Sequence, residues 1–488
     1  MSEDLWEIGA LVAATGGRPI GAMPSVVSGL SIDTRTLQPG DAFFAIKGDR
    51  FDGHGFLTAA VAAGASVLVV AEKKLPALGR VQSPMIVVDD VLVALGRLAE
   101  AARARSKAKI IAVTGSVGKT TTKEALRHAL AASGPVHASA ASFNNHWGVP
   151  LSLARMPADA RYAVFEIGMN HPGEIRPLVK LVRPHVAIVT LIAPAHLGHF
   201  RDLDEIADAK AEIFEGLVVG GTALLNADDP QSSRLATKAR QAGVTAILTF
   251  GESTGADVRL TSFTPAPESS RISAQVEGEE VTIALPVAGR HTAQNVLAVL
   301  GAAKLVGADL QAAAGALETW RSVKGRGQRH SISLPAGGSM VLIDDSYNAN
   351  PASVAAAIAV LGDARPTGEG RRIAVLGDML ELGEHAPALH AGLAGALASA
   401  GLGKVFLAGE AMKSLDDALE GRVACEWHEN TKDLAASLVP QLRSGDVVLV
   451  KASLSMGFGK IVERLLAAGS PEKETASEEG PADAAGKA

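Results

Sequence analysis

Cysteine is nearly absent from this sequence of 488 residues, with Cys425 as its single occurrence. A lone thiol forms no internal disulfide and supplies no set of cysteine ligands for zinc. An excess of positive charge is also missing, because 46 Lys and Arg stand against 52 Asp and Glu, for a net charge of −6. The sequence therefore has no basic footprint for nucleic acid, although scattered arginines could bind a phosphorylated small molecule.

Long apolar runs are lacking too. None reaches the roughly 20 residues that a membrane-spanning helix needs, and the first residues, MSEDLWEIGALVAATG, have no basic flank of the signal-peptide kind. We therefore expect a cytoplasmic protein without membrane insertion. Hydrophobic residues make up 47% and charged residues 20%, which fits an ordinary globular protein. At roughly 100–200 residues per domain, the length indicates about three domains.

The order of apolar runs predicts an α/β protein of three domains. Residues 1–106 read as a small α/β domain that ends in a helix with basic residues. Strand, loop and helix alternate through 107–322, which predicts a doubly wound parallel sheet, with a small antiparallel β insertion at 257–286. A Rossmann-like α/β domain follows over 323–468. The tail, 469–488, has almost no apolar bulk, and we expect it to be disordered.

The stretch AVTGSVGKTTTKEAL resembles a phosphate-binding loop between a strand and a helix. It is shorter than the common G-x-x-x-x-G-K-[ST] pattern, because Val113 stands where the first glycine belongs. A glycine turn here directs backbone N–H groups and the positive helix end at a phosphate, Lys119 adds a charge, and Thr120 offers a hydroxyl to Mg²⁺. A tight turn whose glycines serve packing alone is the alternative, and the strand–loop–helix context disfavours it. The pattern does not separate a kinase, a GTPase and a ligase.

Polar side chains follow several of the predicted strands at the edge where parallel strands present ligands. Glu166 ends the strand in FEIG and suits Mg²⁺, which prefers hard oxygen donors, although a carboxylate there can also cap a loop. His196 follows another strand end, whereas a lone histidine is more often structural. Lys210 lies close to an apolar helix face, on turns neighbouring those of Ile206 and of Ile213 or Phe214, where a snorkelling lysine is the usual interpretation.

Taken together, these motifs resemble the Mur ligase family. The stretches that carry the resemblance run in the family's order from about Ser31 to Lys451: SIDTRTLQPGDAFFAIKGDRFDGHGF, TGSVGKTTTKE, SFNNHWGVPLSLA, FEIGMNHPGEI, APAHL, ADAKAEIF, NADD, GRHTAQN, GRGQR, DDSYNANPAS and LGDMLELGEH. DDSYNANP with LGDMLELGEH is the most specific pair. The Asp-Asn-Pro-Arg motif of the family member that adds diaminopimelate is absent.

The resemblance implies an ATP-dependent ligase of cell-wall precursor synthesis that uses Mg²⁺. Its partners would be UDP-N-acetylmuramoyl-tripeptide and D-alanyl-D-alanine, with no nucleic acid, and we expect a monomer. The tripeptide carboxylate would attack the γ-phosphate of ATP, and the dipeptide amine would then displace phosphate from the acyl phosphate. Two anions must meet in the first step, so cations are needed there. The third tripeptide residue, diaminopimelate or lysine, stays open.

The resemblance also implies roles for individual residues. The loop residues would hold the ATP phosphates: Gly115, Ser116, Val117, Gly118, Lys119, Thr120 and Thr121. Asn295 would face the adenine, Arg329 the phosphates and Asp345 the ribose. Thr120 and Glu166 would hold one Mg²⁺, and His196 with a carbamylated Lys210 a second ion. Carbamylation needs an amine that can lose its proton, which partial burial favours. Catalysis would then rest on Lys119, Glu166, His196 and Lys210.

Substrate contacts follow from the resemblance in the same way. They would come from Thr34, Arg35, Asp49, Arg50, Phe51, Asn144, Asn145, Tyr347, Asn348 and Asn350. The members up to Phe51 match loops that bind the UDP part, and those from Tyr347 would lie near the incoming dipeptide. The turn DDSYNANP can also be read as a strand-to-helix turn stopped by proline and capped by asparagine.

Four positions depart from the family's pattern. Leu191 lies where the family often has Asn, and His196-Leu197-Gly198-His199 stands for His-Leu-Glu-Gly. Thr292 replaces the Asn of Gly-x-His-Asn, and Leu454 replaces a late Arg. Two alternatives stay open. One is a ligase of the same family with another amino-acid substrate. The other is a regulatory P-loop protein, which the absence of Asn-Lys-x-Asp and the unexplained DDSYNANP disfavour.

Overall fold

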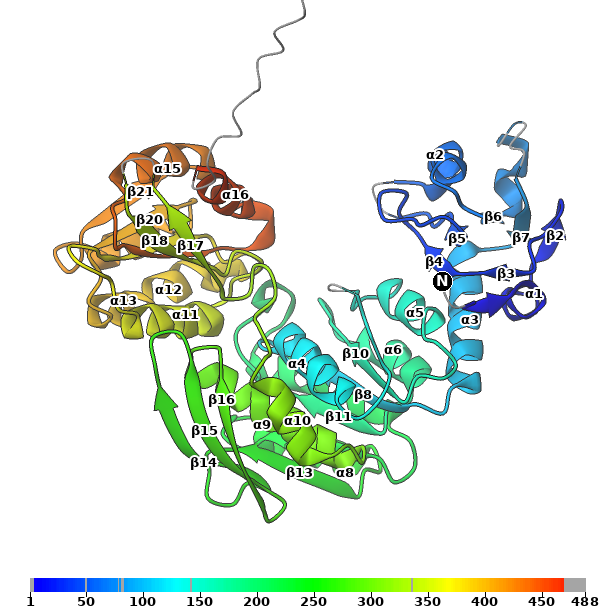
Figure 1. Cartoon of the computed structure of the whole chain (residues 1–488), viewed down its shortest axis with the longest axis horizontal. Helices are drawn as coiled ribbons and strands as arrows, with labels where there is room; N and C mark the ends of the chain where they lie inside the picture. Colours follow the sequence, from blue (N-terminus) through cyan, green and yellow to red (C-terminus); the bar gives the residue numbers. More distant parts are fainter. Residues whose placement is uncertain are drawn as a thin grey trace, which may run out of the picture.

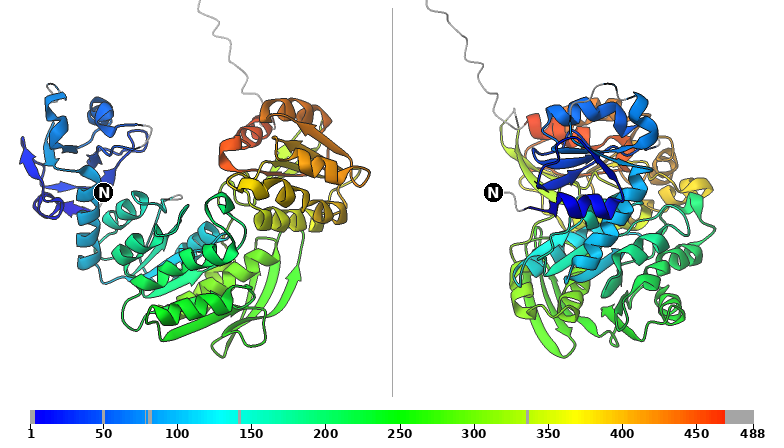
Figure 2. Two further views of the ribbon diagram at one scale, coloured as in Figure 1. Left: turned by 180° about the vertical axis from the view of Figure 1, so that it is seen from behind. Right: turned by 90° about the vertical axis from the view of Figure 1, so that its right-hand side faces the viewer.

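The computed structural model describes residues 4–48, 51–77, 79, 83–140, 143–334 and 337–468. Three α/β domains follow one another, and the first and third rise from opposite ends of the central one (Figure 1). The view from behind shows the same arrangement (Figure 2). Asp49, Arg50 and the tail 469–488 lie outside the described residues. Among those described, no helix has the length and apolar character to cross a membrane.

The N-terminal domain is built on a five-stranded sheet of order β2-β7-β6-β5-β4, in which only β2 is antiparallel to its neighbour. The strand β6 is buried along its whole length, as expected for a strand covered on both faces. The elements are β1 (Trp6–Glu7), α1 (Ile8–Thr15), β2 (Arg18–Ile20), β3 (Val26–Val27), β4 (Gly29–Ser31), β5 (Asp41–Phe44), α2 (Leu57–Ala62), β6 (Val67–Ala71), β7 (Met85–Val88) and α3 (Val91–Arg105).

The central domain has a nine-stranded sheet of order β16-β15-β14-β13-β12-β11-β8-β10-β9. Its strands are β8 (Lys109–Thr114), β9 (Val136–Ala138), β10 (Tyr162–Glu166), β11 (Val186–Val189), β12 (Thr222–Asn226), β13 (Ala246–Gly251), β14 (Val258–Pro265), β15 (Ser270–Val276) and β16 (Glu279–Leu285). The predicted antiparallel segment is present as β15 and β16. It extends the main sheet, because β14 pairs parallel with β13 and antiparallel with β15.

Helices cover both faces of this central sheet. Alternate residues of β8 enter two separate cores, Ile111 and Val113 in one and Ile110 and Ala112 in the other. The helices are α4 (Lys119–Ala131), α5 (Gly148–Ala154), α6 (Ile175–Val182), α7 (Leu203–Ala211), α8 (Ser232–Gln241), α9 (Arg290–Leu305) and α10 (Leu310–Leu317). The strand β8 lies between β10 and β11. Its carboxyl end is therefore the crevice where doubly wound sheets bind ligands.

The C-terminal domain has a six-stranded sheet of order β17-β18-β22-β19-β20-β21, parallel except for β17. Its elements are β17 (Gln328–Ser333), β18 (Ser339–Asp344), α11 (Pro351–Asp363), β19 (Arg372–Gly377), α12 (Ala386–Ala391), α13 (Ala394–Ser399), β20 (Lys404–Ala408), α14 (Lys413–Leu419), β21 (Cys425–His428), α15 (Thr431–Leu438), β22 (Val447–Lys451) and α16 (Gly459–Ala468). The predicted α/β class with three domains is confirmed.

Candidate functional site: a cavity between the central and C-terminal domains

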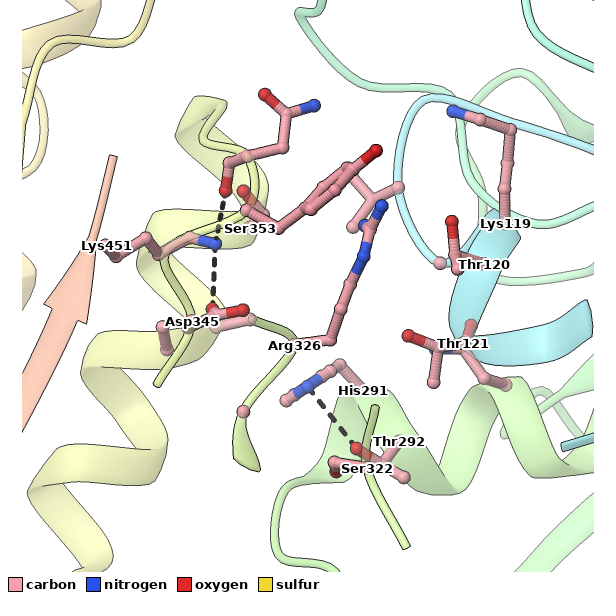
Figure 3. A pocket seen from close by; sticks show the side chains of 18 of the residues that line it. Lys119, Thr120, Thr121, His291, Thr292, Ser322, Arg326, Asp345, Ser353 and Lys451 are labelled. Carbon is pink, nitrogen blue, oxygen red and sulfur yellow. Dashed lines mark hydrogen bonds and ion pairs between the residues drawn. The ribbon is translucent and has the colours of Figure 1, made fainter. Parts of the chain in front are cut away.

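A cavity of about 620 Å³ lies where the central and C-terminal domains meet. Figure 3 shows Lys119, Thr120 and Thr121 on one side and Asp345 with Lys451 on the other. The guanidinium of Arg326 lies between the two groups (Figure 3). The cavity therefore joins the predicted phosphate loop to the motif DDSYN, although the two are far apart in the sequence.

The phosphate loop connects β8 to α4 through glycines that no other residue could replace without a shift. Gly115 has φ 148° and Gly118 φ 87°. A Cβ on Gly115 would lie 2.0 Å from Thr190 Oγ1, and one on Gly118 would lie 2.6 Å from Asn295 Oδ1. The N–H of Ser116 donates to the carbonyl oxygen of Leu191 at 2.7 Å. The departure at position 191 therefore leaves this contact intact, because it uses the backbone.

The side chain of Lys119 lies within the loop. Its Nζ donates to the carbonyl oxygen of Gly115 at 2.7 Å. Burial lowers the pKa of Lys119, the carboxylate of Glu166 opposes this shift, and Arg326 reinforces it. Two cations, Lys119 and Arg326, thus face the same cavity, as the approach of two anionic reactants requires.

Glu166 lies at the carboxyl end of β10 and is 1% exposed. Its Oε2 accepts a hydrogen bond from Thr120 Oγ1 and its Oε1 one from Asn144 Nδ2, both at 2.8 Å. The Thr120 hydroxyl and the Glu166 carboxylate thereby lie together beside the loop, and the Asn144 amide nitrogen holds the carboxylate in place. This donor set suits Mg²⁺, which commonly takes one or two protein carboxylates together with substrate phosphates. In the described ranges no cluster of three His, Cys, Asp or Glu forms a metal cage.

Lys210 is 2% exposed, so the snorkelling interpretation is wrong for this residue. Burial lowers its pKa well below the usual value, and the charge of Lys119 adds to the shift. Its Nζ makes no hydrogen bond to the part of the chain that the structure describes. Lys210 itself does not line the cavity, whereas His196 does. Burial and the charge of Lys119 also lower the pKa of His196, and Lys210 contributes to that shift.

The C-terminal domain contributes a second polar group. Lys451 Nζ donates to Asp345 Oδ2 and to the carbonyl oxygen of Asn348, both at 2.8 Å. The Arg326 guanidinium lies over the Tyr347 ring, 4.4 Å from its centroid. Asn350 accepts from the N–H of Ser353 at 2.9 Å and so caps α11, as the capping interpretation of DDSYNANP predicts. Its Nδ2 also donates to the carbonyl oxygen of Ser116 at 3.5 Å, so this cap touches the phosphate loop.

Arg329 and Asn295 complete the cavity wall. Arg329 Nη1 lies 3.8 Å from Glu268 Oε1, and its buried Nη2 has no partner among the residues described. Burial lowers the pKa of Arg329. A buried guanidinium nitrogen without a partner at a cavity is suited to an anion. Asn295 lies on α9 with its amide against Gly118, which places it beside the loop.

The N-terminal candidates lie apart from this cavity. Arg35 forms a salt bridge with Asp33, and its side chain is 85% exposed. Phe51 is 71% exposed, and its ring centroid lies 6.3 Å from that of Phe56. Neither these residues nor Thr34 lines the cavity. Asn145, in the central domain, accepts from the N–H of Gly148 at 2.9 Å, at the start of α5, and also lies outside the lining.

A second cavity of about 860 Å³ lies at the junction of the N-terminal and central domains.

The sequence interpretation did not select several residues of the cavity lining, among them the charged residues Arg326, Lys451 and Glu268. Arg326 stands in GRGQR and Lys451 in the late Lys-Ala-Ser-Leu stretch, so both motifs carried a signal. Glu268 lies in the turn between β14 and β15, and no pattern marks it.

Comparison with known proteins agrees with this geometry. Family models match at residues 26–103 (Mur ligase family, catalytic domain), 113–303 (Mur ligase middle domain) and 325–454 (Mur ligase, glutamate ligase domain). Two similar proteins are named UDP-N-acetylmuramoyl-tripeptide--D-alanyl-D-alanine ligase. The one from Rickettsia prowazekii is 33% identical over 89% of this chain and 94% of its own. The one from Escherichia coli is 35% identical over 80% and 83%.

Solved structures give the same result. A crystal structure of MurF from Acinetobacter baumannii has a TM-score of 0.80 and 32% identity, over 95% of this chain and 99% of that one. MurF from Thermotoga maritima, in complex with ADP, has a TM-score of 0.74 and 26% identity, over 90% and 97%. On the three family models and the extent of these similarities, the chain belongs to the Mur ligase family.

Proposed function

We propose that this protein is an ATP-dependent ligase that joins D-alanyl-D-alanine to UDP-N-acetylmuramoyl-tripeptide, giving UDP-N-acetylmuramoyl-pentapeptide, ADP and phosphate. One observation carries the proposal. The phosphate loop and the DDSYN turn, from two different domains, line a single cavity. The names of the similar proteins supply the substrates, and the ADP complex of the Thermotoga maritima protein supports the nucleotide.

The chemistry follows from the need for a leaving group. An oxygen of the tripeptide carboxylate attacks the γ-phosphorus of ATP, which forms an acyl phosphate and releases ADP. The dipeptide amine then attacks the acyl carbon, the C–O bond to phosphate breaks, and the amine loses its proton as the amide forms. Lys119 and Arg326 offset the negative charge that gathers in the first step.

Thr120 and Glu166 would hold Mg²⁺ at the phosphates, and the ion would neutralise charge on the transferred group. His196 and Lys210 would hold a second ion. For this role Lys210 would be carbamylated, which converts the ammonium into an anionic oxygen donor. The low pKa that burial gives Lys210 supports this modification, because carbon dioxide reacts with the neutral amine. Lys210→Ala should lower turnover, with partial rescue by a short added carboxylate, and full activity of the variant would contradict the carbamate.

The roles of the remaining residues are proposals too. Arg329, with its unpaired nitrogen, would bind ATP phosphate. Asp345 would accept hydrogen bonds from the ribose while Lys451 balances its charge. Asn295 would face the adenine. Tyr347, Asn348 and Asn350 would position the dipeptide. Asn144, Asn145 and the loops with Thr34, Arg35, Asp49, Arg50 and Phe51 would contact the UDP-linked substrate.

We also propose that the C-terminal domain closes on bound ATP and excludes water from the acyl phosphate. The segment 320–327, between α10 and β17, is the proposed hinge. The proposed domain boundaries at 106/107 and 322/323 fall in the connections between α3 and β8 and between α10 and β17. A monomer in the cytoplasm is the proposed working form.

The test is ADP release by the wild-type protein with each substrate omitted in turn. Sustained release should require ATP, UDP-tripeptide and D-alanyl-D-alanine together, and mass spectrometry should detect the pentapeptide product. Running both tripeptide forms decides between diaminopimelate and lysine. Sustained release without the dipeptide, or with another amino acid in its place, would contradict the proposal.

A further inference from the structure

Two short turns form a direct contact between the central and C-terminal domains. The turn η3 (Leu197–His199) packs against η5 (Gly383–His385). The N–H of Gly198 donates to the carbonyl oxygen of Glu381 at 2.9 Å. A Cβ on Gly383 would lie 3.0 Å from the Cα of Gly198, so the backbones approach closely where no side chain intervenes.

The residues just before these turns share a rare backbone conformation. His196 has φ 59° and Glu381 has φ 65°. Among the described residues, only four that are not glycine have a positive φ, and two of them meet here. Side chains disfavour this conformation, which persists where the surrounding structure holds it and often marks functional positions. Each of the two domains therefore contributes one residue in this rare backbone conformation to the contact.

The side chains complete the contact. His196 Nδ1 is hydrogen-bonded to the Glu381 carboxylate. An ionised carboxylate accepts only, so Nδ1 carries the proton, and in the neutral ring Nε2 keeps its lone pair. No residue in the described part of the chain hydrogen-bonds to Nε2. The His196 ring lines the cavity that also holds Lys119 and Glu166. Its unengaged nitrogen is thus available to the phosphate site.

We propose that Glu381 is a positioning residue that sets the ring of His196 for metal binding when the C-terminal domain is docked. Because His196 belongs to the central domain and Glu381 to the C-terminal one, the ring is fixed only when the two meet. A histidine that binds a metal commonly donates its other ring N–H to a carboxylate, which fixes the ring and its tautomer. The inference rests on the proposed function, in which His196 binds the second ion.

The structure offers a conservative variant and a matched control. Glu381→Gln keeps an oxygen that accepts from Nδ1–H, whereas Glu381→Ala removes the acceptor. The Glu381 side chain is 49% exposed, so both variants should fold. Glu384 lies in the same turn and is exposed, and no hydrogen bond or ion pair joins its carboxylate to the described residues. Glu384→Ala therefore changes the same charge without touching His196.

The experiment measures Mn²⁺ binding to the full chain by electron paramagnetic resonance, with a non-hydrolysable ATP analogue present. Glu381→Ala should weaken Mn²⁺ binding about tenfold or more, the range seen when a metal-bound histidine loses its carboxylate partner. The Mg²⁺ concentration for half-maximal turnover should rise by a similar factor, while the KM for UDP-tripeptide stays unchanged. Glu381→Gln and Glu384→Ala should stay within about threefold of wild type, well below that range.

Three results would overturn the proposal: wild-type Mn²⁺ affinity in Glu381→Ala, a loss in Glu381→Gln as large as in Glu381→Ala, or an equal loss in Glu384→Ala. Failure of the proposed function would look different. A wild-type protein without ligase activity would refute that function, while its Mn²⁺ titration could still be compared with those of the variants.

Discussion

The N-terminal and C-terminal domains meet the central domain through surfaces of opposite character. The N-terminal domain shares a hydrophobic core with it, because Leu151 and Ala154 of α5 belong to the same buried cluster as Trp6 and Leu98. The indole N–H of Trp6 donates to the carbonyl oxygen of Ala154 at 2.9 Å. Arg155 Nε donates across the same junction to the carbonyl oxygen of Leu30 at 2.7 Å.

Among the residues that the structure describes, the C-terminal domain shares no such core with the central domain. Its two buried clusters contain only its own residues. The junction between the C-terminal and central domains has the cavity at its centre. Hydrogen bonds around it join Gly198 to Glu381 and Asn350 to Ser116. A junction of few polar contacts separates at lower cost than one with a continuous core. We infer that the first junction serves stability and the second serves catalysis and closure.

The largest expected effect lies at the second junction. Lys119→Ala should reduce turnover about a thousandfold or more, or about 4 kcal/mol of transition-state stabilisation, because it removes a cation from the phosphate loop. The free energy of unfolding should change little. Steady-state ADP release and urea unfolding check the two parts. A variant that keeps its turnover would show that other groups hold the phosphate.

At the first junction, Trp6→Ala should instead lower the free energy of unfolding by about 3 kcal/mol or more, since Trp6 is 3% exposed within the shared core. Val93→Ala on α3 is the control, because Val93 is 53% exposed and its truncation should cost no more than about 0.5 kcal/mol. Equal stability of the two variants, measured by urea unfolding, would contradict a stabilising role for the core at the first junction.

Acid should also weaken the central domain where it carries the first junction, because α5 contributes Leu151 and Ala154 to the shared core. His137 donates to the carbonyl oxygen of Ser152 in α5, and burial lowers the pKa of His137 from 6.5 to about 4. The unfolded chain therefore binds the proton more tightly. The stabilisation is complete above about pH 6.5 and is lost as the pH falls toward 4, by about 2 kcal/mol at pH 5.

The variant His137→Gln isolates this effect, because glutamine can still donate to Ser152 and does not titrate. Urea unfolding at pH 7.5 and pH 5 should show a drop in wild type that is about 2 kcal/mol larger than in the variant. The same drop in both proteins would assign the acid sensitivity to other groups.

The smallest expected effect is at Arg155. Arg155→Lys should cost about 1–2 kcal/mol of stability, because lysine cannot reproduce the donation from Nε to the Leu30 carbonyl oxygen and leaves that acceptor unpaired. Turnover per folded molecule should change less than in Lys119→Ala. A larger loss of turnover than of stability would show that this junction also takes part in catalysis.

Local patterns in the sequence predicted the buried strands and the two motifs that face each other across the cavity. Buried strands such as β8 and β22 have apolar runs, and the loop with Lys119 has its own motif, so each was recognisable alone. The edge strands β17 and β21 were not predicted. The sequence of β17, QRHSIS, is largely polar, and β21, CEWH, is short and only half-buried in the fold. An edge strand depends on its partner more than on its own composition.

Contacts between domains could not be predicted from the sequence for a related reason. The pair His196 and Glu381 is 185 residues apart and forms only through docking of two separately folded domains. Lys210 was close to an apolar face by pattern, but its nearly complete burial depends on tertiary packing. The family resemblance, by contrast, was confirmed. It rests on short motifs in a fixed order along the chain, and these can be recognised without knowing how the domains dock.

The central claim is that the γ-phosphoryl group of ATP is transferred to the tripeptide carboxylate and is then released as phosphate. The most direct measurement supplies UDP-tripeptide with ¹⁸O in its terminal carboxylate, together with ATP and D-alanyl-D-alanine, and analyses the released phosphate by mass spectrometry. The account predicts one ¹⁸O atom in each phosphate, because the carboxylate oxygen that attacks phosphorus leaves with it. Phosphate without the label, formed together with pentapeptide, would contradict the acyl phosphate route.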